Sequence, residues 1–126
     1  MPSTDLNTLA ASLSNEDYCY LTTKGRVSGN PHKIEIWFSI HASNLYLLSG
    51  GGLDSDWVKN LLREPKVDVR IDKFNFSGKA MLVNNPEEDK LARELLAAKY
   101  YRWKKGKPLN DWARTATPVV VKLSVK

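Results

Sequence analysis

The chain has 126 residues, of which 42% are hydrophobic and 26% charged, and its 19 Lys and Arg outnumber its 14 Asp and Glu. This length and balance fit one globular domain over residues 1–126 and exclude a wholly disordered chain or a collagen-like fibre. The net charge of +5 favours anionic partners, namely phosphate groups, acidic cofactors, nucleic acid or anionic membrane surfaces. A basic face that merely keeps the protein in solution explains the same charge.

Cysteine and histidine are too few to predict a disulfide framework or a metal centre. Cys19 stands alone, and neither His32 nor His41 has a metal-ligand spacing around it. The segment from Met1 to Leu13 lacks the basic leader and apolar run of a signal peptide, and no apolar run elsewhere is long enough to span a membrane. We therefore expect a cytoplasmic protein with no structural metal and no integral membrane segment.

Apolar periodicity and turn residues predict the order of elements along the chain. Offsets of three, four and seven residues indicate helices, alternation indicates strands, and Gly, Asn and Pro indicate turns. Over 33–40 the alternation predicts one apolar face with Ile34, Ile36, Phe38 and Ile40, and an opposite face with Glu35, Trp37 and Ser39. The expected elements are a helix over 3–13 with caps within Ser3–Asp5, strands over 18–23, 33–40 and 45–49, a helix over 54–63 capped by Asp54 and Asp56, strands over 66–72 and 74–84, a helix from the Asn85 cap to about Trp103, and a strand over 117–125.

The short links between these strands favour antiparallel pairing. About six strands with two or three helices at the ends predict a mainly β fold, a small closed barrel, which also removes the exposed sheet edges that short strands would leave. No internal repeat and no low-complexity linker divides the chain. One barrel domain is therefore expected.

The turn over residues 24–33 is the first candidate site. Its glycines let backbone N–H groups approach an anion, while Lys24, Arg26 and Lys33 supply positive charge. It has neither a Walker motif nor a GxGxxG motif before a helix. An ordinary basic β-turn would use the same Gly, Asn and Pro, so both interpretations stay open.

Two further segments have the composition of a binding site. Gly50, Gly51 and Gly52 precede a helix and could cradle a phosphate, although the following acids would repel an anion and a flexible connection explains the glycines equally well. Aromatic and basic residues interleave over 99–107, where they could stack a nucleobase, line a pocket for a planar substrate or simply pack on the barrel.

Motifs for side-chain catalysis are missing from the sequence. There is no GxSxG elbow, no HExxH and no Cys/His pair in a catalytic context. No catalytic residue is therefore assigned. If the protein is an enzyme, a cofactor is expected to carry the chemistry.

Four blocks between Leu21 and Val121 carry a resemblance to a known family. They are TT-x-GR-x-SG-x-P, a serine–glycine loop, W-x-x-NL-x-x-x-P-x-V-x-V and a final W-x-x-x-x-x-P-V-V-V. In this order they resemble the split-barrel flavin and deazaflavin oxidoreductases, cousins of the pyridoxamine-phosphate oxidases, and most of all the deazaflavin-dependent nitroreductase and quinone reductase branch. The resemblance implies a six-stranded antiparallel split β-barrel, often dimeric, that binds the deazaflavin coenzyme F-420 or FMN.

The resemblance also implies a set of site residues. Those expected to contact the cofactor are Lys24, Arg26, Ser28, Gly29, His32, Lys33, Glu35, Ser49, Gly50, Gly51, Trp57 and Asn60. Those expected on the substrate side are Tyr100, Tyr101 and Trp103. Val27 stands where several relatives carry a second basic residue, which keeps FMN open beside the deazaflavin.

Together these features predict an oxidoreductase that transfers hydride from reduced coenzyme F-420 or FMN to a planar acceptor such as a quinone or nitro compound. The protein would supply orientation, hydrogen bonds to the ring and exclusion of water. Two alternatives are a non-enzymatic β-barrel that binds nucleic acid and a barrel that holds a flavin or haem-like ligand without turnover. Because the cations are spread over several elements, we expect no nucleic-acid partner. The resemblance implies a homodimer whose partner is a small-molecule electron acceptor.

Overall fold

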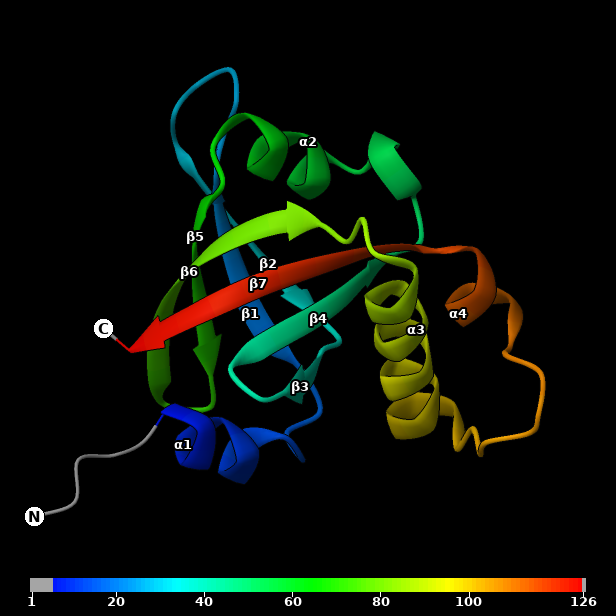
Figure 1. The fold of residues 1–126 in the computed structure, drawn as a ribbon. Coiled ribbons are helices and arrows are strands. Elements are labelled where there is room, and N and C mark those ends of the chain that lie inside the picture. Colours follow the sequence, from blue (N-terminus) through cyan, green and yellow to red (C-terminus); the bar gives the residue numbers. More distant parts are fainter. Residues whose placement is uncertain (1–5, 126) are drawn as a thin grey trace, which may run out of the picture.

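The computed structural model describes residues 6–125, and its centre is one antiparallel sheet of seven strands in the order β2-β1-β5-β6-β7-β4-β3 (Figure 1). The strands are β1 (Cys19–Lys24), β2 (Pro31–Ile36), β3 (Ser39–His41), β4 (Asn44–Ser49), β5 (Lys66–Ile71), β6 (Phe74–Leu82) and β7 (Thr117–Val125). The helices are α1 (Leu6–Leu13), the short 3-10 helix η1 (Gly52–Asp54), α2 (Asp56–Arg63), α3 (Pro86–Tyr101) and α4 (Asp111–Thr115). The predicted mainly β split-barrel class is confirmed, with seven strands in place of six.

The extra strand arises because the segment 33–40 is not one continuous strand as predicted. The chain leaves the sheet at Trp37 and Phe38, so that β2 pairs with β1 at one edge and β3 pairs with β4 at the other. Two residues therefore join the two edges of the sheet and bring it round into a barrel. The predicted faces survive the break, since Phe38 is buried in the barrel core and Ile36 packs against it. Alternation specifies the face of each side chain and not its partner strand.

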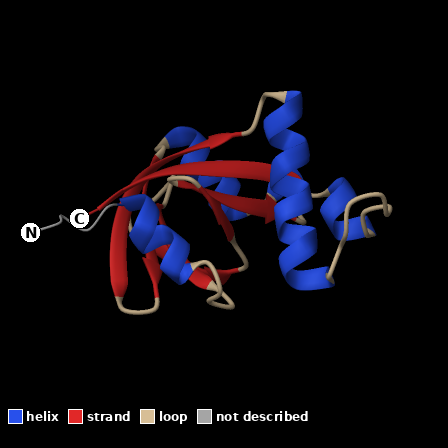
Figure 2. Ribbon diagram, turned by 60° about the horizontal axis from the view of Figure 1, so that its bottom comes forward, coloured by secondary structure: helices blue, strands red, loops and turns tan. Residues whose placement is uncertain are grey.

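The sheet has apolar residues on both faces where the long helix covers it. The inside of the barrel holds the larger cluster, with Leu21 and Phe76 among its fully buried members. On the outside, Tyr46 and Leu48 of β4 pack with Leu96 of α3 in a second cluster. Figure 2 shows α3 standing at one side of the strands, with α4 to its right. Burial from both sides explains why β4 is almost wholly apolar instead of alternating.

The helix boundaries confirm some of the predicted caps and correct others. Asn85 caps α3 as predicted, because its side chain accepts hydrogen bonds from the N–H groups of Glu87 and Glu88 at 2.9 and 3.0 Å. Ser55, and not an aspartate, is the N-cap residue of α2. The caps expected within Ser3–Asp5 lie outside the described residues. The five-residue α4 was not predicted, since one turn and a half is too short to show an apolar period.

The helices occupy three different sides of the barrel. In Figure 1, α2 lies over one end of the barrel, α1 lies at the opposite end, and α3 with α4 covers one flank. No helix within residues 6–125 is both long enough and apolar enough to cross a membrane. The end beneath α2 is where the β1–β2 turn and the glycine run of the sequence both arrive.

Candidate functional site

The basic loop, residues 24–30 between β1 and β2, is held against α2 by one buried amide. The Oδ1 atom of Asn60 accepts from the backbone N–H and the Nη1 atom of Arg26 at 3.1 and 2.8 Å, and its Nδ2 atom donates to Thr23 Oγ1 at 3.1 Å. Asn60 and Thr23 are buried. Arg26 also pairs through Nη2 with Asp56 Oδ1 at 3.1 Å. The arginine that the resemblance assigns to the cofactor therefore has protein partners that shape the loop.

A cavity of about 300 Å³, the loop pocket, lies beside this loop. Lys24 and Arg26 line it from the loop, and Arg63 and Glu64 line it from the end of α2. Three cations against one carboxylate suit a phosphate or carboxylate ligand. Ser28 and Gly29 also line the pocket, and the Ser28 hydroxyl accepts from the Asn30 N–H at 3.1 Å, as in an ordinary turn. The structure adds Arg63, which was not predicted.

The glycine run 50–52 connects α2 with a second cavity. Ser49 Oγ donates to the carbonyl of Gly52 at 2.8 Å and lies 2.8 Å from Ser55 Oγ, so the end of β4 is tied to the start of α2. The next residue, Gly50, lies against the indole of Trp112. A Cβ atom at Gly50 would stand 3.7 Å from the Trp112 ring, so a longer side chain would cover the ring that glycine leaves open.

The second cavity, the aromatic pocket, has a volume of about 290 Å³ and lies next to the glycine run. Its lining residues are Glu35, Ile36, Trp37, Leu48, Tyr101 and Trp112. The rings of Trp37 and Trp112 meet edge to face, with centroids 5.6 Å apart and planes at 87°, and Tyr101 lies 5.8 Å from Trp112. Trp37 is 42% exposed and Tyr101 48% exposed, so both side chains are partly accessible to a ligand. Flat apolar walls with one carboxylate suit a planar ligand.

Tyr100 does not line this pocket but supports one of its walls. Its ring stacks on Trp37 with centroids 4.4 Å apart and planes at 3°. Its hydroxyl accepts from the Phe38 N–H at 3.0 Å and lies 3.0 Å from the Phe38 carbonyl and 2.9 Å from the Asp17 carbonyl. Lys99 Nζ donates to the same Phe38 carbonyl at 3.0 Å. Helix α3 thus satisfies the backbone groups freed by the strand break and holds Trp37 in place.

Lys99 is a half-buried ammonium group that also lies over the Phe38 ring, 3.7 Å from its centroid. Burial lowers the pKa of Lys99 from 10.5 to about 8, and the neighbouring Cys19 and Asp17 act against this shift. Burial has the opposite consequence for the thiol, because it raises the pKa of Cys19 from 9.0 to about 12. Burial likewise raises the pKa of Tyr100 to about 12, so its hydroxyl keeps its proton.

These pKa shifts predict how stability depends on pH. Between pH 8 and 9 the folded chain releases the Lys99 proton while the unfolded chain keeps it, since the pKa falls from 10.5 to about 8 on folding. The free energy of unfolding should therefore rise over this interval, by less than about 1 kcal/mol because water still screens the group. Above pH 9 the Cys19 thiol lowers the free energy of unfolding as the pH rises. The unfolded chain loses the thiol proton at a lower pH than the folded chain, in which the thiol is buried.

Urea unfolding of the wild type and of Lys99→Met at pH 7, 8 and 9 measures this effect. The variant should lack the rise between pH 8 and 9, whatever the absolute cost of losing the hydrogen bond to Phe38. Parallel pH profiles of the two proteins would show that Lys99 does not titrate as described.

The other predicted residues lie outside the two cavities. His32 and Lys33 are both exposed on β2, with the His32 ring beside Gly25 of the basic loop and Lys33 Nζ 4.7 Å above the Tyr20 ring. Trp57 packs against the barrel core. The indole of Trp103 donates to the Lys107 carbonyl at 2.7 Å and lines a separate cavity. Of the predicted cofactor and substrate residues, the aromatic pocket brings together Glu35 and Tyr101.

Two residues of the aromatic pocket, Trp37 and Trp112, were not predicted as site residues. Trp37 appeared in the sequence as one outward position of an alternating strand. Trp112 begins the W-x-x-x-x-x-P-V-V-V block that carries part of the family resemblance, so its fixed spacing to Pro118 was the signal available. Among residues 6–125 no group of three His, Cys, Asp or Glu side chains could hold a metal ion.

Comparison with known proteins identifies the family. No curated protein matches the sequence. A candidate 5-nitroimidazole antibiotic resistance protein from Bacteroides thetaiotaomicron has a TM-score of 0.70 at 19% identity, covering 98% of this chain and 82% of that chain. A candidate pyridoxamine 5'-phosphate oxidase from Listeria innocua has a TM-score of 0.69 at 16% identity, covering 95% and 96%.

A structure titled F420 reductase shares the fold as well, with a TM-score of 0.63 at 17% identity, covering 99% of this chain and 97% of that chain. At these identities the solved structures establish the fold alone. The family model described as F420H(2)-dependent quinone reductase, however, matches residues 3–124, nearly the whole sequence. The chain therefore belongs to the family of F420H(2)-dependent quinone reductases.

Proposed function

We propose that this protein binds reduced coenzyme F-420 with its planar ring in the aromatic pocket and its anionic tail toward the basic loop, and reduces a quinone. The observation that carries the proposal is the open aromatic pocket beside Gly50. The description of the family, F420H(2)-dependent quinone reductase, supplies the cofactor and the acceptor. When bound, the reduced deazaflavin supplies the hydride. The chain itself has to bind the coenzyme and the quinone and to orient one against the other.

The residues present fit a flat ring with an anionic tail. Gly50 leaves free the space over Trp112 that a side chain would fill. Strand β2 runs from the loop pocket to the aromatic pocket, and the five steps from Pro31 to Ile36 cover about 17 Å at ~3.3 Å per residue. That length suits a coenzyme with a ring at one end and negative charge at the other. Lys24 and Arg63 supply the charge at the tail end.

The pocket contributes orientation more than proton transfer. Hydride transfer depends on holding donor and acceptor in contact at a fixed angle, which rigid aromatic walls achieve. Trp37, clamped by Tyr100, and Trp112, which lies against Gly50, provide two such walls. The Glu35 carboxylate at the pocket can accept a hydrogen bond from a ring N–H.

Titration with coenzyme F-420 and with FMN, followed by tryptophan fluorescence, tests the proposal. We expect saturable binding of the deazaflavin and at least about tenfold weaker binding of FMN, a difference of ~1.4 kcal/mol. Gly50→Leu should weaken deazaflavin binding by about tenfold or more, because the new side chain covers Trp112. Ala98→Leu adds similar bulk on the exposed face of α3 and should change nothing.

The outcomes separate the alternatives. Tighter binding of FMN would replace the proposed cofactor, and no saturable binding of either compound would remove the proposed function. With the bound deazaflavin reduced, a quinone should be turned over faster than a nitroaromatic compound of similar size. The homodimer expected from the resemblance stays a prediction.

A further inference from the structure

Three lysines form a row across the outer face of the sheet. Lys66 of β5 stands opposite Lys79 of β6, which in turn stands opposite Lys122 of β7. Side chains at opposite positions of antiparallel strands are neighbours, and like charges there destabilise the sheet. None of the ion pairs found within residues 6–125 involves these lysines. Two acids lie near the Lys66 end of this lysine row, namely Glu64, and Asp68 two residues along β5 on the same exposed side. The lysine row therefore keeps more positive than negative charge on this face.

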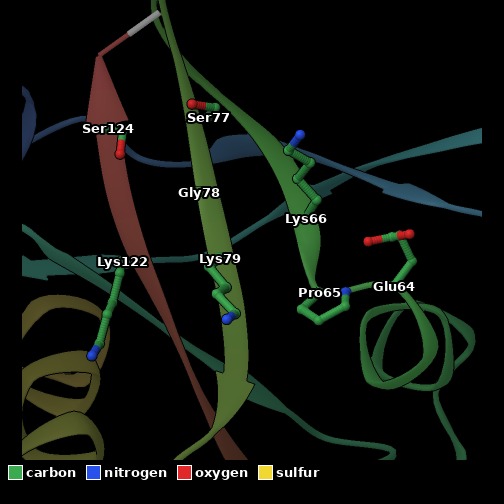
Figure 3. A pocket seen from close by; sticks show the side chains of 8 residues that line it. All are labelled: Glu64, Pro65, Lys66, Ser77, Gly78, Lys79, Lys122 and Ser124. Carbon is green, nitrogen blue, oxygen red and sulfur yellow. The ribbon is translucent and has the colours of Figure 1, made fainter.

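The lysine row lines a cavity of about 400 Å³, drawn in Figure 3. Ser77 and Ser124, which also stand opposite each other in the sheet, lie together at one end of it. Figure 3 shows the ammonium group of Lys66 extending toward that end, whereas those of the other two lysines extend toward the opposite end. Glu64 is the one acid among the described lining residues.

Gly78 contributes only backbone to this cavity. A Cβ atom at Gly78 would lie 2.4 Å from Val121 Cγ1 and 3.0 Å from the Lys122 carbonyl oxygen, so β6 and β7 approach too closely there for any side chain. Because Val121 belongs to the barrel core, this Cβ atom would point to the inner face, so the glycine serves the close packing of β6 on β7.

We propose that the lysine row binds a ligand that carries two or more linked phosphate groups. Three ammonium groups offer nine N–H donors and a charge of about +3, of which Glu64 and Asp68 offset two. Neighbouring strands lie about 4.8 Å apart, so the row spans about 10 Å, more than one phosphate or carboxylate can bridge. Linked phosphates carry several negative charges at neutral pH and would relieve the repulsion along the whole row. The two serine hydroxyls can donate to the remaining oxygens.

This site shares no residue with the aromatic pocket, where the cofactor ring is proposed to lie. It shares Glu64 with the loop pocket, and a further cavity lined by Lys24, Glu64, Lys66 and Ser77 adjoins both. Because the test uses pyrophosphate alone, the proposal does not depend on which cofactor the protein uses.

Isothermal titration of the full chain with pyrophosphate in 150 mM NaCl tests the lysine row. The wild type should bind one pyrophosphate, and Lys79→Gln/Lys122→Gln should bind at least about tenfold more weakly, since each lysine contributes a charge-assisted hydrogen bond. The matched control Lys104→Gln/Lys105→Gln removes the same charge from exposed positions between α3 and α4 and should bind within about twofold of the wild type.

Orthophosphate and tri-glutamate are the comparison ligands, and both should bind at least about tenfold more weakly than pyrophosphate. Equal binding of tri-glutamate would show that the row recognises carboxylates and would overturn the proposal, as would equal losses in the control variant. Thermal unfolding without ligand gives a second readout. Lys79→Gln/Lys122→Gln should be at least as stable as the wild type because it loses a repulsion, so weaker pyrophosphate binding cannot come from unfolding.

Discussion

The Asn60→Leu variant is expected to lower the free energy of unfolding by about 3 kcal/mol, the loss of three hydrogen bonds with a buried hydroxyl left unsatisfied. Asn60 is 2% exposed, and its amide joins α2 to Arg26 and to Thr23. Leucine has a similar shape but neither accepts nor donates. Because the basic loop depends on this amide, limited proteolysis after Lys24 and Arg26 should also become faster. Urea unfolding measures the main effect.

Asn60→Asp is the matched control. Its carboxylate still accepts from both Arg26 groups, and the Thr23 hydroxyl can turn to donate to it, so less than half of the destabilisation is expected. Equal stability of Asn60→Leu and the wild type would mean that the loop is held by other contacts.

Replacing Trp37 by leucine is expected to weaken binding of the deazaflavin by about 5- to 150-fold, because ring stacking on one aromatic side chain contributes ~1–3 kcal/mol. Trp37 provides one wall of the aromatic pocket and is held parallel to Tyr100 at 4.4 Å. Since Trp37 is 42% exposed, its removal should cost far less stability than the loss of a core residue. Fluorescence titration and steady-state kinetics with a quinone measure the effect.

Trp103→Leu is the control, because Trp103 is also a partly buried indole near the end of α3 but lies outside the aromatic pocket. It should lose its hydrogen bond to Lys107 and leave cofactor binding within about twofold of the wild type. Similar weakening in both variants would show that the bound ring does not lie against Trp37.

The segment from Lys33 to Ile40 shows the limit of what alternation can predict. Its apolar positions were assigned to the correct face, and Phe38 and Ile36 do contact the barrel core. The break at Trp37 was not predicted, because it depends on backbone hydrogen bonds to the Tyr100 hydroxyl and the Lys99 ammonium. These partners lie 62 and 61 residues further along the chain, beyond any local pattern.

The candidate site shows the same division between motif and contact. The family resemblance pointed to the basic loop and the glycine run. The loop lines a cavity at the end of α2, and the glycine run leads into the start of α2. It could not show that Arg26 already has Asn60 and Asp56 as partners, since that depends on how α2 lies on the loop. It also left out Trp112, whose position against Gly50 follows from the packing of α4.

By itself, the sequence determined which side of each strand faces the core, where α3 is capped, and the mainly β class, because each of these follows from residues a few positions apart. Its length and positive charge indicated one small domain with anionic partners. Tertiary structure decided which strands are neighbours and which rings meet around the aromatic pocket. It also separated the basic residues into a loop pocket and a lysine row, because the register of β5, β6 and β7 places three distant lysines side by side.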